Sequence, residues 1–345
     1  MKPLKSQPLK LASAIAISFL AFSAQASDTQ TSENNSFQHD TSASYITDTD
    51  NSDNAYLFAS YRYYFNAVST DLGPWALSTF LAQSSNFGFN YLKSDLFETS
   101  SYQVDGTYVF DSKWFVGANY QQINDDSDYG PWPYDYDESL YGLKLGYYFN
   151  ESSQISLFYQ NQSGSDSYQH TSGSGQNFQI GLLAANFDNQ SDTFGLEAQS
   201  YIPMESISGV NLLARWQYTD ASQYYYFRLA QDGFMPERDF TTDIDNTLNH
   251  IYLAADFYIN KSWSIGAHYT WQDIDLKEFI SSSNYSPEGE TIELSDSFNN
   301  YGLNTAYWWQ ITQNFSAKFS ASKLLNDDAN VEDGLLLGLD INARF

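Results

Sequence analysis

The sequence predicts an all-β protein: a transmembrane, antiparallel, up-and-down β-barrel of about 14 strands, with 12 or 16 strands as the alternatives. Three observations lead to this prediction. Apolar and polar residues alternate along many segments, most of these segments are about ten or eleven residues long, and aromatic residues gather at their ends. A secreted β-sandwich would also show the alternation, but it would scatter its aromatic residues along the strands.

The first 26 residues are typical of a cleaved secretory signal peptide. Lys2, Lys5 and Lys10 precede an apolar run over 11–22, and Ala24-Gln25-Ala26 follows it, which predicts cleavage before Ser27. The alternative is an N-terminal anchor, but the apolar run is shorter than the roughly 20 residues of a spanning helix. Residues 27–53 then form an acidic N-terminal segment with a weak first strand, and residues 54–345 form the barrel.

Segment 332–345 alternates most clearly, because Leu337, Leu339 and Ile341 share one face and Asp340 and Arg344 the other. The same rule predicts the other strands. The fourteen expected strands are 38–48, 54–65, 76–91, 99–110, 113–123, 138–149, 153–162, 192–202, 209–220, 247–259, 262–273, 296–309, 313–323 and 332–345. Two further stretches, 177–187 and 223–230, are expected to pair as a ribbon outside the membrane or, alternatively, to span it and raise the count to about 16.

Aromatic residues flank the short turns between these strands, as in Phe110 and Trp114 or Phe257 and Trp263. Rings at the rim of an apolar band are typical of a membrane interface. On the opposite side of the predicted barrel we expect long polar loops. These loops are 124–138, 163–191, 220–246, 274–296 and 324–332. Short turns on one side and long loops on the other place the long loops outside the cell.

The composition excludes several function classes. The formal net charge is −27, which disfavours a nucleic-acid partner. The chain has no Cys and only 4 His, so we expect no disulfide, no thiolate site, no specific metal site and no cofactor.

Short motifs at several strand ends resemble one known family. They include Tyr63-Tyr64-Phe65-Asn66 followed by Gly73-Pro74, the Tyr-Gly-Leu openings at 141–143 and 301–303, and the final Asn342-Ala343-Arg344-Phe345. Over most of residues 54–345 the chain resembles the general porins of Gram-negative outer membranes. The resemblance implies passive diffusion of small polar solutes, and it implies that Phe345 is an aromatic residue recognised by the outer-membrane insertion machinery.

The predicted location is the cell outer membrane. The expected partners are outer-membrane lipid and lipopolysaccharide, the insertion machinery and small polar solutes, and a homotrimer is left open.

Fourteen strands are closer to the sixteen that enclose an aqueous channel than to the eight that side chains fill. Charges on the polar faces are assigned to a water-filled lumen, because a charge that faces lipid costs about 2–4 kcal/mol near the midplane. These candidate pore-lining residues are Arg62, Asp105, Lys144, Glu197, Arg215, Asp256, His268, Lys318, Asp340 and Arg344. The alternative for each is a structural charge, paired within the barrel wall.

Loop 124–138 is the candidate constriction, because general porins fold the loop after the fifth strand inward. Its acids are Asp125, Asp126, Asp128, Asp135, Asp137 and Glu138. Opposite Arg62, Lys144, Arg215 or Arg344, they would set a transverse field across the pore. The alternative is an exposed acidic loop. Acidic loops outside a balanced lumen predict a mild preference for cations.

Two other functions are weighed against a channel. A closed barrel would display its loops for adhesion or as a phage receptor. An outer-membrane hydrolase would need a histidine beside a nucleophile or a carboxylate. His39, His170, His250 and His268 lie in no recognisable nucleophile motif, so no enzyme is expected.

Overall fold

The computed structural model describes residues 36–51, 55–96, 98–125, 136–169, 180–231, 235–282, 286–312, 314–325 and 334–345. Fourteen strands make up almost all of this part of the chain. They are β1 (Ser36–Asp48), β2 (Ala55–Ser69), β3 (Asn86–Ser94), β4 (Thr99–Val109), β5 (Trp114–Asp125), β6 (Tyr136–Asn150), β7 (Ser153–Gln169), β8 (Ile180–Pro203), β9 (Gly209–Gln231), β10 (Met235–Asn260), β11 (Trp263–Ser282), β12 (Ser286–Gln310), β13 (Phe315–Leu324) and β14 (Leu336–Arg344).

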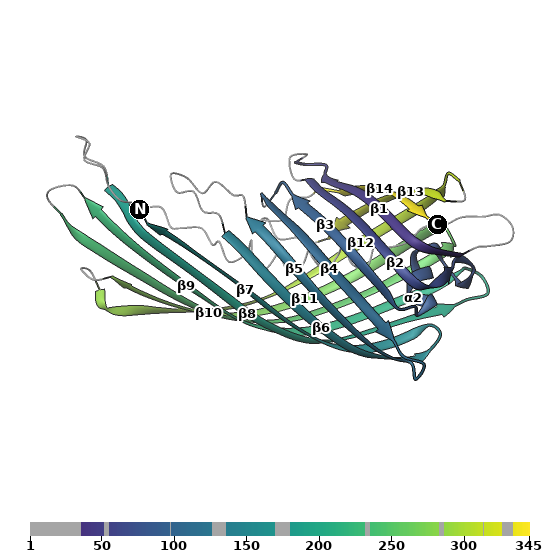
Figure 1. Cartoon of the computed structure of the whole chain (residues 1–345), viewed down its shortest axis with the longest axis horizontal. Helices are drawn as coiled ribbons and strands as arrows, with labels where there is room; N and C mark the ends of the chain where they lie inside the picture. Colours follow the sequence, from purple (N-terminus) through teal and green to yellow (C-terminus); the bar gives the residue numbers. More distant parts are fainter. Residues whose placement is uncertain are drawn as a thin grey trace.

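The strands form one closed barrel in which every strand pairs with its sequence neighbours and β1 pairs with β14 (Figure 1). All pairs are antiparallel, and the closing pair runs from Asp40 opposite Arg344 to Asp48 opposite Leu336. Phe345 extends this seam, because its carbonyl accepts hydrogen bonds from the backbone N–H groups of Gln38 and His39. The prediction of a 14-stranded antiparallel barrel is therefore confirmed. Closure leaves no unpaired edge where the wall meets hydrocarbon.

The outer surface of the barrel carries an exposed apolar belt, in contrast to a water-soluble protein. Leu143 of β6 and Leu157 of β7 are 64% and 60% exposed. We call the end of the barrel that holds Phe345 and the short turns the periplasmic end. Large aromatic side chains surround this end. These exposed rings are Phe65, Phe110, Trp114, Phe149, Trp263, Trp309, Phe315 and Phe345.

Tyrosines mark the rim of the apolar belt that is farther from the periplasmic end. The hydroxyl of Tyr269 donates to Asn299 Oδ1 at 2.6 Å, and that of Tyr159 donates to Asp192 Oδ1 at 2.5 Å. A tyrosine whose ring contacts apolar groups while its hydroxyl forms a hydrogen bond is typical of a membrane interface. The outward-facing apolar stripe of each strand therefore ends where these hydroxyls meet polar side chains.

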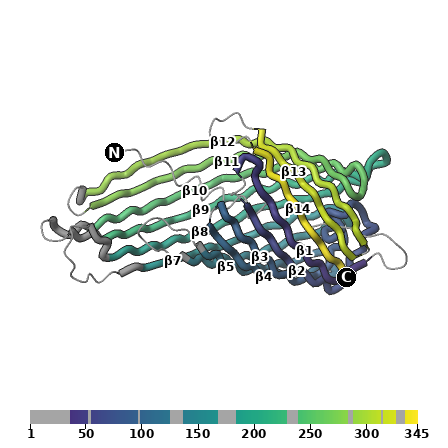
Figure 2. Tube along the Cα trace, turned by 90° about the horizontal axis from the view of Figure 1, so that it is seen from above, coloured from purple at the N-terminus to yellow at the C-terminus, as the bar shows by residue number. Residues whose placement is uncertain are grey.

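The barrel wall extends much further from the periplasmic end on one side than on the other (Figure 2). Strands β8 to β12 have 20 to 26 residues, whereas β13, β14 and β1 to β5 have 9 to 15. We call the part of β8–β12 above the tyrosines the outer wall. It comprises residues 180–192, 220–231, 235–249, 273–282 and 286–299.

The outer wall lies where the sequence predicts loops, so this prediction is wrong for three of the five. Most of 163–191, 220–246 and 274–296 continues the strands instead of forming loops. Of the stretches 177–187 and 223–230, residues 177–179 lie outside the described residues. The rest do pair, as Phe187 opposite Tyr225 shows, but as extensions of β8 and β9, so the count of 16 is wrong. Polar side chains do not interrupt a ladder of backbone hydrogen bonds, and water replaces lipid outside the membrane without ending the strand.

The expected strand 76–91 is also wrong over its first half. After β2 the chain forms η2 (Thr70–Leu72), η3 (Trp75–Leu77) and α2 (Ser78–Ala82), and β3 begins only at Asn86. Figure 1 places α2 at the same end of the barrel as the C-terminus.

Among the described residues, the only α-helix has five residues, and no helix is long and apolar enough to cross a membrane.

Candidate functional site

One row of the ladder crosses five neighbouring strands and brings together charges from four of them. Arg344 lies opposite Asp40, Asp40 opposite Arg62, Arg62 opposite Gly88, and Gly88 opposite Asp105. All four charged residues are on the inner face, so positive and negative groups alternate along the interior wall. Asp40 was not among the sequence candidates. Its position on the polar face of the weak first strand is the signal that could have identified it.

Arg62 crosses β3 to reach its partner on β4. Its Nη1 and Nη2 atoms donate to the two Asp105 oxygens at 2.7 and 2.9 Å. Gly88 makes this path open, because a Cβ atom there would lie 2.8 Å from the guanidinium carbon of Arg62. Asn90 Nδ2 donates to Asp105 Oδ1 at 2.9 Å, and Asn86 Oδ1 accepts from Arg62 at 2.5 Å. Such a bidentate pair holds both side chains in one orientation.

A second buried group combines Lys144 of β6, Glu197 of β8 and Arg215 of β9. Lys144 Nζ lies 3.0 Å from Glu197 Oε1, and Arg215 Nε donates to Glu197 Oε2 at 2.9 Å. Glu197 is only 6% exposed, and the guanidinium of Arg215 lies over the Phe158 ring at 5.9 Å. Two cations share one carboxylate, so this group has a net positive charge.

A third group lies at the seam between β14 and β1. Arg344 is 3% exposed, and its Nε is 3.1 Å from Asp40 Oδ2. Asn342 Nδ2 also donates to Asp40, at 2.5 Å, and the Phe37 ring lies 4.2 Å from the guanidinium carbon of Arg344. In the next part of the seam, Asp340 accepts a hydrogen bond from Ser44.

The remaining candidates also occupy the inner face. Lys318 lies opposite Asp340 in the ladder, and its ammonium lies 5.8 Å from the Trp308 ring centroid. Asp256 accepts from Asn304 Nδ2 at 3.1 Å. His268 stacks on Tyr252, with ring centroids 6.0 Å apart.

The structure therefore places all ten pore-lining candidates inside the barrel and gathers most of them into ion-paired groups. That they line a conducting pore stays a prediction.

The candidate constriction falls largely outside the described residues. Asp126, Asp128 and Asp135 belong to that undescribed part, and Asp125 ends β5. Asp137 and Glu138 begin β6 rather than a loop. Asp137 is exposed, whereas Glu138 is buried and accepts hydrogen bonds from Asn189 Nδ2 at 2.7 Å and from Gln162.

The four bases expected to oppose these acids have acids of the wall as partners: Arg62 has Asp105, Lys144 and Arg215 have Glu197, and Arg344 has Asp40.

Two histidines lie on the inner face, one on β10 and one on β11. His250 is buried, and its Nε2 atom has no hydrogen-bond partner among the described residues. His268 contacts Tyr252 as described above. His39 instead lies at the periplasmic end, where its ring stacks on Phe345 at 5.4 Å. His170 lies outside the described residues.

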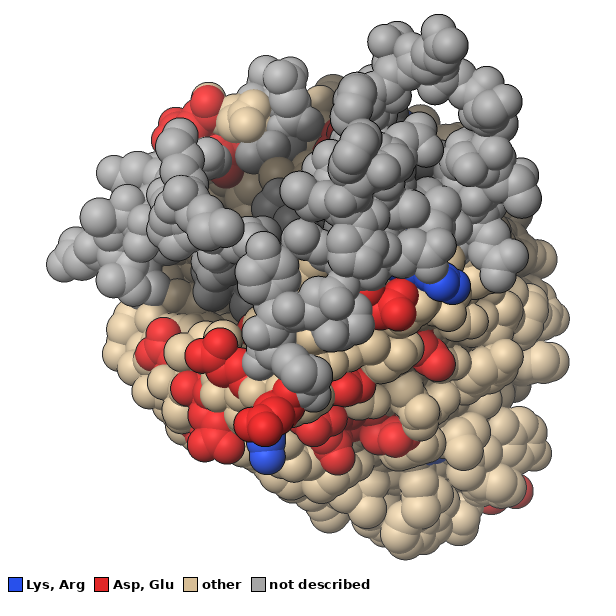
Figure 3. All heavy atoms as spheres, turned by 90° about the vertical axis from the view of Figure 1, so that its left-hand side faces the viewer, with Lys and Arg blue, Asp and Glu red and all other residues tan. Residues whose placement is uncertain are grey.

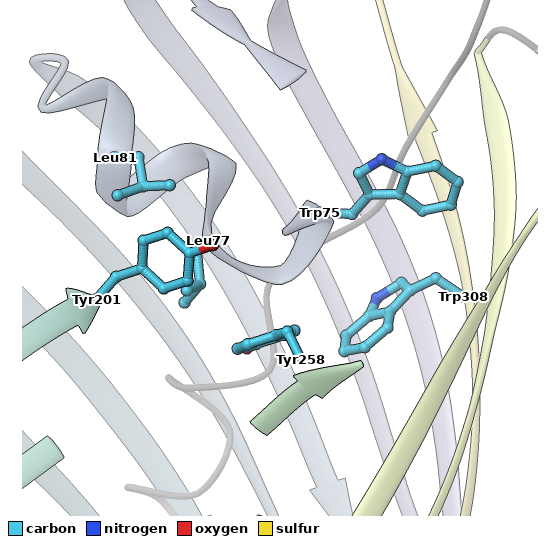
Figure 4. Close-up of a cluster of buried hydrophobic side chains, with 6 residues drawn as sticks. All are labelled: Trp75, Leu77, Leu81, Tyr201, Tyr258 and Trp308. Carbon is cyan, nitrogen blue, oxygen red and sulfur yellow. The ribbon is translucent and has the colours of Figure 1, made fainter. Parts of the chain in front are cut away.

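Residues 70–85, which we call the plug segment, connect β2 to β3 and fold into the periplasmic end of the barrel (Figure 4). Side chains of this segment and of the far wall form one buried apolar cluster. Its members are Trp75, Leu77 and Leu81 of the plug segment, Tyr201 of β8, Tyr258 of β10 and Trp308 of β12. Because β8 to β12 lie across the barrel from β2 and β3, the plug segment crosses the interior.

Polar contacts hold the plug segment to two periplasmic turns. The backbone N–H of Trp75 donates to the Lys261 carbonyl at 3.1 Å, and Lys261 Nζ lies 3.5 Å from Asp71 Oδ1. Gln83 Nε2 donates to the Asn150 carbonyl at 2.6 Å. The segment is thus attached to the barrel on several sides.

The plug segment was missed in the sequence, although it carries a signal. Gly73-Pro74 is a turn dipeptide, and the following Trp75-Ala76-Leu77 is consecutively apolar instead of alternating. A Cβ atom at Gly73 would lie 2.7 Å from Leu81 Cδ1 and 3.4 Å from the Tyr201 ring, so the turn packs closely against its own helix and β8.

Comparison with known proteins gives structural likenesses only. No protein-family model matches the sequence, and no curated protein matches it. The structure is similar to the outer membrane protein Omp33 of Acinetobacter baumannii, with a TM-score of 0.47 and 15% identity over 91% of this chain and 100% of that one.

Two receptors are also similar. The ferric-catecholate import receptor Fiu of E. coli K12 has a TM-score of 0.42 and 10% identity, and 85% of this chain covers 55% of it. The siderophore receptor PiuA of A. baumannii has a TM-score of 0.41 and 13% identity, and 86% of this chain covers 50% of it. The chain thus spans about half the length of these two receptors.

A closed, single-chain barrel with an even number of antiparallel strands and an exposed apolar belt is the architecture of bacterial outer-membrane proteins. The chain is an outer-membrane β-barrel. Its interior is polar and charged, and its periplasmic end contains the plug segment.

Proposed function

We propose that this barrel is a channel for passive diffusion of small hydrophilic solutes, and that the plug segment narrows its periplasmic mouth. The observation that supports a channel is the inner wall, where charged groups such as Arg62 with Asp105 and Lys144 with Glu197 replace the apolar filling of a small barrel. A wall of this kind favours polar solutes over apolar ones.

We further propose a mild preference for cations. The outer wall presents many carboxylates on its outward face, among them Asp243 and Asp245 of β10 and Asp275 of β11. Figure 3 views the outer end and shows acidic side chains gathered there with few basic ones. Carboxylates near a pore mouth raise the local concentration of cations.

One observation favours a second candidate, a closed barrel that displays its outer wall for adhesion or as a phage receptor. The plug segment packs on Tyr201, Tyr258 and Trp308 of the opposite wall, and it is fastened to Lys261 and Asn150 as well. If these contacts persist, they obstruct the periplasmic mouth.

Planar-bilayer conductance and liposome swelling with small sugars separate the two candidates. The native chain has no Cys, so an Asp71→Cys/Lys261→Cys pair can be bridged, without side reactions, by a short bifunctional reagent that forms a reducible disulfide with each thiol. For a channel whose plug segment moves, bridging lowers the conductance and reduction restores it. The matched control is Lys93→Cys/Asp95→Cys, because this exposed pair has a similar separation of 3.3 Å and lies far from the plug segment.

Each outcome selects one candidate. Sugar entry and ion conductance with the wild-type protein support the channel. A barrel that neither conducts nor swells liposomes, and that stays closed when the plug contacts are removed, supports the display function instead.

A further inference from the structure

Because β13 is shorter than β12, the N-terminal part of β12 has no neighbouring strand on its β13 side among the described residues. β13 pairs with β12 only from Gly302 to Gln310, and one further bond joins the Leu325 N–H to the Tyr301 carbonyl at 2.7 Å. In the described part of the chain, residues 290–299 pair with β11 alone. We call residues 290–299 the β12 edge. At about 3.3 Å per residue it is about 33 Å long.

The direction of the backbone groups follows from the adjoining ladder. In antiparallel pairing the N–H and C=O of one residue point to the same side, and successive residues alternate. Tyr301 bonds toward β13, whereas the Trp308 N–H bonds toward the β10–β11 turn at Ser262. The backbone N–H and C=O groups of the odd-numbered residues therefore point away from β11. On the β12 edge these are Thr291, Glu293, Ser295, Ser297 and Asn299, none of them proline.

An unpaired edge of this kind is a template for another extended chain, and proteins usually shorten, bulge or cover it. Pro287 and Gly289, which has a φ of +73°, come before the β12 edge and do not interrupt it. Residues 290–297 are all exposed, including Leu294 at 61%. The side chains of the edge are thus exposed, and among the described residues its backbone has a partner strand on the β11 side only.

The charges on the edge select the partner. Glu290, Glu293 and Asp296 lie on it, and two acids of the neighbouring β11, Asp273 and Asp275, share its outward face with Glu293. One base, Lys277 of β11, lies opposite Glu293, with its Nζ 3.9 Å from Glu293 Oε1 in an exposed pair, so acids outnumber bases here by five to one. A second copy of this chain would bring like charges together. Residues 326–333, which lie outside the described residues, include Asp327, Asp328, Glu332 and Asp333, so they are an equally poor match in charge.

The two faces of the edge differ in chemistry. The interior side carries Ile292, Leu294 and Phe298 together with the acids Glu290 and Asp296, whereas Glu293, Ser295 and Ser297 point outward. We propose that the β12 edge binds an extended polypeptide segment in which apolar side chains alternate with lysine or arginine. Backbone hydrogen bonds to the odd-numbered residues hold the segment, its apolar side chains pack beside Ile292 and Leu294, and its basic side chains meet Glu293.

The test uses the full-length barrel in detergent and a dye-labelled peptide of about ten residues that alternates valine and lysine. The variant is Ser295→Pro/Ser297→Pro, which removes two N–H donors from the free side and none from the β11 ladder. The matched control is Ser295→Ala/Ser297→Ala, which keeps both donors. By fluorescence anisotropy we expect equal binding to wild type and control, and about tenfold weaker binding to the proline variant.

A second peptide that alternates proline and lysine has the same charge but cannot form the ladder, and we expect it to bind about tenfold more weakly. Glu290→Gln/Glu293→Gln/Asp296→Asn keeps the backbone intact and serves if the proline variant does not fold. Weaker valine–lysine binding to this variant, together with hydrogen-exchange protection of 290–299 by the peptide in wild type, supports the proposal.

Equal binding of the valine–lysine peptide to the proline variant, equal binding of the two peptides, or no binding to wild type overturns it.

Discussion

Arg344 of β14 donates a hydrogen bond from Nη1 to Ser78 Oγ of the plug segment at 3.1 Å. The same guanidinium forms the buried ion pair with Asp40 of β1. One side chain therefore links the closing seam of the barrel to the segment that crosses its mouth. Because the two contacts involve different partners, substitutions can separate them.

The first prediction concerns this link. Ser78→Ala removes the contact to Arg344 and leaves the ion pair with Asp40 in place. We expect a higher open probability or conductance in planar bilayers, with the free energy of unfolding lowered by about 1 to 3 kcal/mol at most. Arg344→Gln should open the channel similarly but cost about 3–5 kcal/mol, because it leaves Asp40 buried and without its charge partner. Equal currents in all three proteins would show that Ser78 does not hold the plug segment.

The second prediction concerns the path of Arg62 over β3. Gly88→Ala places a Cβ 2.8 Å from the guanidinium carbon, so Arg62 must leave Asp105 or the strand must shift. We expect a loss of about 1–3 kcal/mol in urea unfolding.

Gly117→Ala is the control, because its nearest contact would be an ordinary 3.4 Å and its stability should change little. Similar losses for both variants would contradict the role given to Gly88.

The third prediction locates the membrane. Leu157 and Leu294 are 60% and 61% exposed, yet Leu157 lies in the apolar belt and Leu294 in the outer wall. Leu157→Arg should destabilise the barrel by up to about 2–4 kcal/mol in phospholipid vesicles, because it places a charge in hydrocarbon. Leu294→Arg should be nearly neutral. A reversed order would mean that the belt is not the lipid-facing surface.

The fourth prediction concerns ion selectivity. In a KCl gradient the reversal potential should indicate mild cation preference, since carboxylates outnumber bases around the outer wall. Neutralising Asp243, Asp245 and Asp275 to Asn should reduce this preference, and raising the salt concentration should reduce it as well through screening. Anion selectivity of the wild-type channel would refute the prediction.

The fifth prediction tests the β5–β6 connection. Asp135→Asn/Asp137→Asn/Glu138→Gln together should change conductance and ion preference if this connection narrows the pore. Glu138→Gln alone is the informative control, because Glu138 already lies inside the barrel and accepts from Asn189. If the triple variant behaves like the wild type, the constriction expected from the sequence does not exist.

The inner face of the barrel was predictable because it is a local property. A strand side chain points in or out according to its parity, so Arg62, Glu197 and Arg344 could be assigned to the interior from their neighbours in sequence. Their partners were not predictable. Whether Arg62 meets Asp105 depends on the register of β2, β3 and β4 and on the missing Cβ of Gly88 between them.

The two errors in the strand assignment have one origin, which is that local polarity does not by itself decide whether a segment is a strand of the wall. The polarity of 163–191, 220–246 and 274–296 predicts loops, but a strand in water keeps its ladder as well as a strand in lipid, and most of these residues continue the strands. Likewise the apolar run Trp75-Ala76-Leu77 predicts a wall strand but belongs to the plug segment. Its apolar partners are Tyr201, Tyr258 and Trp308, which lie more than a hundred residues away in the chain.

Taken alone, the order of residues determined a closed β-barrel with a polar inner face and an apolar outer face, since hydrophobic periodicity and ring placement depend only on adjacent positions. Folding in three dimensions decided which carboxylate neutralises which base, how far β8–β12 extend beyond the shorter strands, and that residues 70–85 pack against the opposite wall. Those outcomes depend on contacts between distant segments, whose energies appear only when the strands have closed around a common interior.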